Sequence, residues 1–335
     1  MIRGRAWSGA MRLAWLVAAA GMVVGLAPSG AGAQDDIVEL GDLLAISNAG
    51  VYIGIEKGYF KEQKIQNRIT TFASAGKAMP ALTTGELDVS VGTISAGLFN
   101  AIGEGAGFRI VADKGQGRAG TGYVLLTVRK DLVQSGQVKS VKDLKGRKVS
   151  LYAKGINQDY ILGKMAEEVG LTIKDFEIVY LAGPSQLTAY ETKAIDAAMV
   201  VEPWGANFEE KGVGVRFRTP DQVKSIGPMQ IAVVMYSEKF IKERRAQAQR
   251  WMNAYLKGAA YYATKGTQDA EVVSIIEKYT KVPAKAIRAA IPHGQSRDGR
   301  PIMDSIADQI AWFAANGYLP KRVTADQVVD LSFLR

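Results

Sequence analysis

Cysteine is absent from the 335 residues, and histidine occurs once, at His293. The missing thiol excludes disulfides, thiolate metal sites, a cysteine nucleophile and a lipoprotein cysteine. The sequence also has no G-x-S-x-G elbow, no Walker lysine and no metal-ligand spacing. His293 stands between a proline and a glycine, and we expect it to be exposed in a loop. We therefore predict a protein that is not an enzyme and uses no cofactor or metal, although carboxylates paired in space stay an open alternative.

Long apolar runs are also scarce, and the one that is present lies at the N-terminus. Arg3, Arg5 and Arg12 give this segment a basic start, Leu13–Ala27 is uncharged, and Ala31–Ala33 reads A-x-A. The run is shorter than the roughly 20 residues of a membrane-spanning helix. We expect the first 33 residues to be a signal peptide that is removed on export to the periplasm; an N-terminal membrane anchor is the alternative.

Charge of one sign is not concentrated anywhere in the chain. The 42 Lys and Arg outnumber the 33 Asp and Glu, which gives a net charge of +9. Leaving out the three arginines of the first 33 residues lowers this charge to +6. The densest basic run, Lys139–Lys148, is typical of a solvated helix edge and turn. The composition argues against nucleic-acid binding and gives a mild bias toward acidic ligands.

Short apolar runs alternate with helical patterns, which predicts an α/β fold with two mixed, mainly parallel sheets flanked by helices. About 300 residues exceed one comfortable core, so two domains are expected. We expect strands at residues 37–42, 69–72, 87–91, 109–113, 124–128, 148–152, 177–180, 197–201 and 231–236. We expect helices at 47–56, 77–84, 95–102, 158–169 and 185–192, and a mostly helical chain from 237 onward. Within that helical part, the aromatic stripe from Trp251 to Tyr262 is typical of a core.

A short internal repeat, called the internal echo below, indicates that the two domains have the same order of secondary-structure elements. Residues 81–88 and 189–196 both read as a helix, a turn and an apolar-Asp pair before an apolar strand. We predict that residues 34–120 and 231–335 form lobe I and that residues 121–230 form lobe II.

The predicted crossings between the lobes are rich in glycine. The chain would cross at Arg118–Tyr123 and return at Ile226–Ile231, where glycine suits a hinge of two segments. Gly115, Gly117 and Gly120 match the G-x-G-x-x-G dinucleotide fingerprint by letter. That site needs a helix after the glycines, whereas a strand pattern follows here, so the motif indicates a linker.

Polar residues cluster where the predicted strands end, and loops at those ends bind ligands in open α/β sheets. Each such residue has the alternative role of a helix cap. The candidates for ligand binding are Ser47, Asn48, Ser74, Lys77, Thr93, Lys154, Asn157, Gln158, Gln186 and Glu202, with Tyr52, Tyr123 and Trp204 for stacking.

Four motifs in order carry a family resemblance over nearly the whole chain after residue 33. Gly54–Lys61 is similar to A-x-E-K-G-Y-F-K, and Ala81–Val89 to A-L-x-x-G-x-x-D-V. Asp143–Val149 is similar to D-L-K-G-K-K-V, and Ile195–Trp204 to x-D-A followed by E-P-W. The chain thus resembles the periplasmic solute-binding proteins of nitrate, sulfonate and taurine ABC importers and the related binders of thiamine-pyrimidine precursors.

The resemblance implies a bilobal periplasmic-binding fold of type II, a small-molecule ligand held between the lobes, and an ABC permease in the inner membrane as partner. It also implies a monomer. The family's cleft residues would fall chiefly on Ser47, Asn48, Ser74, Thr93 and Glu202.

Two departures from the family pattern bear on the site. Lys193 replaces a common helix-stopping glycine, which leaves the geometry of that turn open. No arginine clamp for an anion is apparent, and Glu202 would instead accept an amine or a ring N–H, or serve the fold alone. A small organic acid or sulfonate is the leading ligand; a nitrogen heterocycle stacked on Tyr52, Tyr123 or Trp204 is the alternative.

Overall fold

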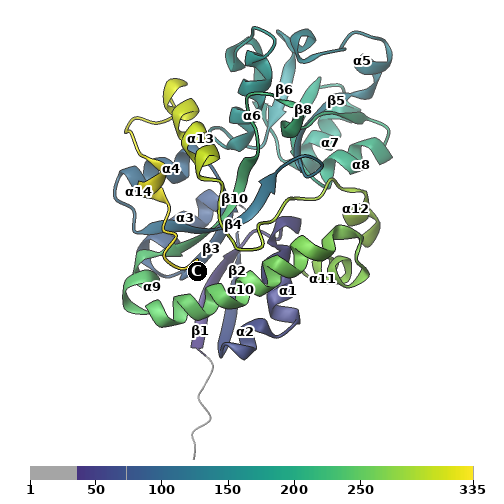
Figure 1. Ribbon diagram of the computed structural model, residues 1–335. Coiled ribbons are helices and arrows are strands. Elements are labelled where there is room, and N and C mark those ends of the chain that lie inside the picture. Colours follow the sequence, from purple (N-terminus) through teal and green to yellow (C-terminus); the bar gives the residue numbers. More distant parts are fainter. Residues whose placement is uncertain (1–35, 73, 335) are drawn as a thin grey trace, which may run out of the picture. The chain divides into compact units, whose positions relative to one another are not determined.

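Two five-stranded sheets organise the chain in the computed structural model, which describes residues 36–72 and 74–334 (Figure 1). The predicted signal peptide lies outside these residues. The first sheet has the order β2-β1-β3-β10-β4 and the second has the order β7-β6-β8-β5-β9. The strands of the first sheet are β1 (Asp36–Asp42), β2 (Ile65–Thr71), β3 (Val89–Thr93), β4 (Phe108–Gly117) and β10 (Met229–Ser237). Those of the second are β5 (Val124–Arg129), β6 (Lys148–Leu151), β7 (Glu177–Tyr180), β8 (Ala197–Val201) and β9 (Gly214–Arg218).

Both sheets are mixed, as expected from the sequence. In the first, β1 runs parallel to β2 and β3, whereas β10 is antiparallel to β3 and β4. In the second, β6 is parallel to β7 and β8, whereas β5 is antiparallel to β8 and β9. β10 in the first sheet and β5 in the second occupy the same fourth place in the strand order. Each follows a crossing of the chain from the other sheet, and each is antiparallel to both of its neighbours. The internal echo is therefore a true repeat of topology.

The helices cover the faces of the two sheets, and several run beside one another (Figure 1). The first part of the chain contributes α1 (Ala49–Glu56), α2 (Tyr59–Glu62), α3 (Ala75–Thr84), α4 (Ala96–Gly103), α5 (Lys130–Gln134), α6 (Asn157–Glu167), α7 (Gly183–Glu191) and α8 (Trp204–Glu210). The last part contributes α9 (Glu238–Glu243), α10 (Arg245–Lys265), α11 (Ala270–Thr280), α12 (Ala284–Ala289), α13 (Met303–Ala315) and α14 (Ala325–Val328). The aromatic stripe of α10 is buried, as predicted, and stacks Trp251 on Tyr255.

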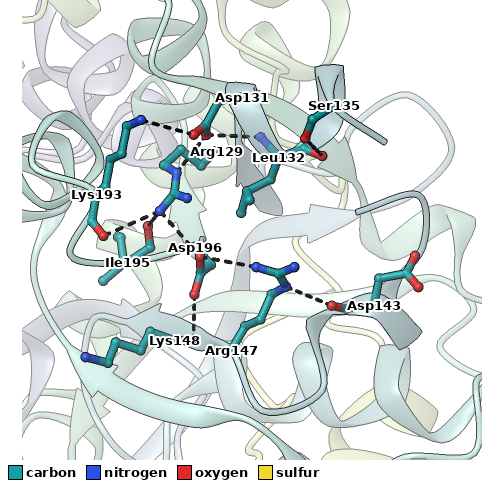
Figure 2. Close-up of polar contacts among 10 residues, drawn as sticks. All are labelled: Arg129, Asp131, Leu132, Ser135, Asp143, Arg147, Lys148, Lys193, Ile195 and Asp196. Atoms are coloured by element: carbon teal, nitrogen blue, oxygen red, sulfur yellow. Dashed lines mark hydrogen bonds and ion pairs between the residues drawn. The ribbon is translucent and has the colours of Figure 1, made fainter. Parts of the chain in front are cut away.

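An aspartate directly precedes β3 and another directly precedes β8, and each bonds to a neighbouring strand of its sheet. Asp88 accepts a hydrogen bond from the Glu39 amide at 3.0 Å and binds Arg244. Asp196 accepts from the Lys148 amide at 3.1 Å, and its carboxylate lies 3.3 Å from Arg129 (Figure 2). The repeated apolar-Asp pair of the sequence is therefore a repeated bond between neighbouring strands, with an arginine partner on each side.

Lys193 keeps the turn that a glycine makes in the first repeat. Its φ of 58° is left-handed, like the 75° of Gly85. The Lys193 carbonyl accepts a bond from Arg129 at 3.4 Å, and its ammonium lies 3.5 Å from Asp131 (Figure 2). The left-handed conformation costs a non-glycine residue about 1 kcal/mol, which these contacts offset in part.

Direct contacts join the two sheets on the side of α13. Ser95 forms a bridge with Ile156, and Asn157 donates to Thr93 Oγ1 at 2.8 Å. Trp312 of α13 fits against Gly163 of α6, where an added Cβ would lie 2.1 Å from the indole. The chain passes between the sheets after Gly117 and before Met229; whether these crossings bound two lobes and act as hinges stays a prediction.

Candidate functional site

The strongest candidate site is a cavity of about 330 Å³ at strand ends of both sheets. The loop after β1 supplies one wall, the ends of β6 and β8 and the start of β5 supply the second, and the chain after α12 supplies the third. Its lining consists of Leu43, Leu44, Ala45, Ile46, Ser47, Tyr123, Tyr152, Val201, Glu202, Pro203, Trp204, Thr267, Val282, Ala290, Ile291, Pro292 and His293. Aromatic and aliphatic side chains dominate it, as in pockets that bind flat organic molecules.

His293 is buried, with 4% of its surface exposed, so the expectation of an exposed loop residue was wrong. It stacks on Tyr262, with ring centroids 4.1 Å apart, and meets the edge of Tyr123 at 5.7 Å. Burial and the charge of Lys114 lower its pKa to about 3, so the imidazole is neutral at physiological pH. No local pattern predicts this burial, because the packing partners Tyr123 and Tyr262 come from distant segments.

Two lining residues keep a buried polar atom without a hydrogen-bond partner. Within the described ranges, buried side-chain atoms that lack a partner are amide atoms of Asn and Gln, except for the Tyr123 hydroxyl and His293 Nε2. An unmet buried polar group costs about 1–3 kcal/mol. The Ser47 side chain acts on the Tyr123 hydroxyl and opposes the rise in its pKa that burial causes, so His293 Nε2 is the atom with the clearer need of a partner.

Glu202 lines the cavity but is held by protein donors. Its Oε2 accepts from the Ala206 amide at 3.0 Å, and its Oε1 accepts from Arg216 at 3.2 Å and from the Ile291 amide at 3.3 Å. Burial raises the pKa of its carboxyl group, with these donors acting in the opposite direction. The residue therefore joins the second sheet to the chain after α12, and contact with a ligand stays a prediction.

A buried polar cluster lies behind the wall formed by Ser47. Asp42 accepts a bond from Tyr52 at 2.8 Å and another from the amide of Asn48. The Asn48 carbonyl oxygen accepts from the Lys114 ammonium at 2.6 Å. Burial of Lys114 lowers its pKa to about 8. Asn48 thus stands between a carboxylate and an ammonium group.

A second buried acid, Asp113, lies within β4 next to Lys114. Its carboxylate accepts from Gln230 at 2.8 Å, from the Gly115 amide at 2.9 Å and from the Ser296 amide at 2.7 Å. Burial raises its pKa to about 7 despite these donors. The network fixes the chain after His293 against the first sheet.

Four of the thirteen residues predicted to bind ligand line the cavity, namely Ser47, Tyr123, Glu202 and Trp204. The other nine lie outside its lining. Asn48 and Tyr52 belong to the cluster around Asp42, while Thr93 and Asn157 bond to each other. Gln158 accepts from the Tyr152 amide, and Gln186 donates to Ser150. Ser74, Lys77 and Lys154 are exposed. A binding role for these nine residues stays untested.

Three residues of the site escaped sequence reasoning. Tyr152 and His293 line the cavity, and Lys114 lies behind it. Lys114 follows a predicted strand and opens a glycine-rich stretch, where an exposed lysine is the usual case. The Asp113-Lys114 pair after an apolar run was a usable signal of a buried polar site, because β4 continues through both residues to Gly117. The G-x-G-x-x-G letters accordingly begin inside a strand, and no helix follows them before β5.

The family model described as NMT1/THI5 like matches residues 46–268. Among solved structures, the alkanesulfonate-binding protein SsuA from Xanthomonas axonopodis pv. citri, bound to MOPS, is similar at a TM-score of 0.69 and 16% identity, over 88% of this chain and 98% of that one. The aliphatic sulphonate binding protein SsuA from Escherichia coli gives 0.70 and 17%, over 88% and 92%. The nitrate-binding protein NrtA from Synechocystis PCC 6803 gives 0.67 and 17%, over 89% and 86%. No curated protein sequence matched the chain.

Two mixed sheets of the same strand order, flanked by helices and with a cavity at their strand ends, define a periplasmic-binding fold of type II. The match over residues 46–268 shows that the chain belongs to the NMT1/THI5-like family. In the part of the chain that the structure describes, no helix has the length and apolar character needed to cross a bilayer.

Proposed function

We propose that the protein is the periplasmic solute-binding component of an ABC importer and that it does not transform its ligand. The single observation that supports this most is the cavity, because both sheets and the chain after α12 contribute to its walls. A solute in that position contacts every part that a closing movement would bring together. The sulfonate- and nitrate-binding proteins with the same fold favour the same role.

The lining favours a small organic solute with a flat apolar body and at least one polar group. Tyr123, Tyr152, Trp204 and His293 offer aromatic faces or edges to such a body. Ser47, Tyr123 and His293 supply hydroxyl and imidazole groups that can form hydrogen bonds with its polar end. Among the described lining residues there is no lysine or arginine, so both ligand classes, the small organic acid or sulfonate and the nitrogen heterocycle, remain candidates.

The test is a thermal-shift and calorimetry panel on the protein purified after export. The panel contains aromatic and aliphatic carboxylates, sulfonates, nitrate and aminopyrimidines. A specific ligand at 100 times its dissociation constant stabilises the protein by about 2.7 kcal/mol. The bound compound is then released by denaturation and identified by mass spectrometry. Recovery of an altered compound, or stabilisation by nucleotides alone, contradicts the proposal.

Trp204→Leu provides a matched check that the ligand occupies this cavity. The change removes one aromatic face from the lining and is expected to weaken binding about tenfold, which corresponds to about 1.4 kcal/mol. Tyr180→Leu is the control, since Tyr180 is 47% exposed at the end of β7 and lies outside the lining. Equal affinities of the two variants would place the ligand elsewhere.

Glu202→Gln separates the two ligand classes. The change removes a negative charge from the lining. The Ala206 and Ile291 amides bond to different oxygens of Glu202, so the single oxygen of glutamine keeps one of these two bonds. An amine-bearing heterocycle is expected to bind more weakly to this variant, and an anion equally well or better.

A further inference from the structure

Lys114 is placed by an irregularity in the first sheet. Ala232 of β10 pairs with Gly115 and Val233 pairs with Asp113, so Lys114 is an extra residue that bulges out of β4. Bulges of this kind redirect a side chain and are frequent beside functional sites. Here the bulge turns a lysine into the interior, where it is only 2% exposed.

The buried ammonium group has too few partners. Its hydrogen bond to Asn48 Oδ1 uses one of three N–H donors, and no carboxylate of the described chain forms a salt bridge with it. The nearby Asp42 is already bonded to Tyr52, to Asn48 and to the Leu43 amide. Burial lowers the pKa of Lys114 more than the charges of Asp42 and Asp113 raise it. A buried ammonium group that is only partly compensated is unfavourable, so a lysine kept solely for packing is hard to explain.

The two unmet polar atoms of the cavity lie in the same neighbourhood. The charge of Lys114 acts on His293, whose pKa it lowers. The Tyr123 hydroxyl reaches β4 beside Lys114, since a Cβ added to Gly115 would lie 2.6 Å from it. Ser47, which lines the cavity, is next in sequence to the Asn48 that holds the ammonium. Ser47, Tyr123 and His293 thus share one wall of the cavity, and the hydroxyl and imidazole groups of that wall can donate hydrogen bonds close to the positive charge of Lys114.

We infer that Lys114 sets the charge of the solute, and that the cavity takes a flat organic anion whose carboxylate or sulfonate group meets the wall of Ser47, Tyr123 and His293 in front of the Lys114 ammonium. This inference rests on the proposed function. Tyr123 and the neutral imidazole supply hydrogen bonds, while Lys114 supplies the charge from behind the wall. In a dry interior such a charge acts over several ångströms, because little water screens it.

The experiment measures binding of matched pairs of an anion and its neutral amide by calorimetry. The probes are benzoate with benzamide, benzenesulfonate with benzenesulfonamide, and nicotinate with nicotinamide. The wild-type protein is expected to prefer at least one anion over its amide by tenfold or more, and Lys114→Gln to lose that preference while it retains the amide's affinity. Lys61→Gln, which removes an exposed lysine of α2, is the control and is expected to match wild type.

The pH dependence supplies a readout that a purely structural role would not move. Ionisable groups around Lys114 are Asp42, Tyr52, Asp113, Tyr123, Tyr255 and His293. Since the pKa of Lys114 is about 8, anion affinity is expected to fall in wild type between pH 7.5 and 9.5 and to change less in Lys114→Gln. The carboxyl of Asp113, with a pKa of about 7, contributes to the fall below that range in both proteins.

The outcomes separate the inference from the proposed function. A wild-type preference for the amides, or an anion preference that survives in Lys114→Gln, overturns the role of Lys114 while solute binding stands. Binding of none of the six probes contradicts both the flat-solute proposal and this inference. Should Lys114→Gln fail to fold, Lys114→Met replaces it, because an apolar side chain of similar length suits a buried position.

Discussion

Replacing Lys114 with methionine tests the buried ammonium group through the stability of the protein, independently of any ligand. The lysine is buried, and its pKa is about 8 in the folded chain against 10.5 for a free lysine. A lowered pKa means that the fold disfavours the charged form. The difference between these two pKa values corresponds to about 3 kcal/mol.

The sign of the pH dependence follows from which state holds the proton. Below pH 8 both the folded and the unfolded chain carry the charge, and the full cost is present in the fold. Between pH 8 and 10.5 the unfolded chain keeps its proton while the folded chain releases it, so the free energy of unfolding rises with pH. Lys114→Met has no such proton, and this rise is expected to be absent from its stability curve.

The assay is urea unfolding of both proteins at intervals from pH 6.5 to 10.5. The difference in unfolding free energy, wild type minus variant, is expected to increase by about 3 kcal/mol over that range. At pH 7 the variant is expected to be more stable than wild type by about 1–2 kcal/mol. Removing the buried charge stabilises the fold, and leaving the Asn48 oxygen without its hydrogen bond offsets part of that stabilisation. Parallel curves for the two proteins would refute the buried, destabilised ammonium and with it the basis for the role of Lys114 in binding.

Three further predictions concern the fold. Gly163→Ala is expected to destabilise the protein by about 1–3 kcal/mol in urea unfolding, since the new Cβ would lie 2.1 Å from Trp312; an unchanged midpoint would mean that the helices separate freely. Lys193→Gly is expected to stabilise it by about 0.5–1 kcal/mol, because glycine adopts a φ of 58° without strain; a loss of stability would contradict this account of the turn. Asp196→Asn is expected to cost about 1–3 kcal/mol through its bonds to Arg129 and to the second sheet, and 1 M salt is expected to shrink the difference from wild type.

The fold could be predicted from the sequence largely because its signals are local. Apolar runs marked most strands within a few residues, and Gly58 and Gly85 stand in left-handed turns after the predicted helices. The strand Gly214–Arg218 was missed because it is only five residues long, although its Val-Arg-Phe-Arg sequence alternates as a strand does. The strand Phe108–Gly117 was cut short because glycines within it gave a turn signal, although they serve the close approach of Tyr123.

The site was predictable only where it follows the ends of strands. Ser47 follows β1, Glu202 follows β8, and Trp204 begins α8 soon afterwards. Tyr123 is the exception because it directly precedes β5, and all four residues line the cavity. The candidate role of Asn48 as a helix cap gave no hint of its bonds to a carboxylate and an ammonium group. Such a partnership depends on which strands become neighbours, and no sequence period encodes that.

The segment around His293 explains how the site is assembled, because it is bonded to both sheets. On the side of the second sheet, the Glu202 carboxylate accepts a hydrogen bond from the Ile291 amide. Arg216 of the edge strand β9 donates a hydrogen bond to the Ala289 carbonyl. On the other side, the first sheet holds the chain through two bonds between Gln116 and Gly294 and through Asp113. His293 stands between these two anchors, so a solute that contacts it meets a segment that neither sheet positions alone. A ligand bound there is therefore coupled to the relative placement of the sheets through a few hydrogen bonds of about 3 Å, which is the connection that a binding protein needs between occupancy and shape.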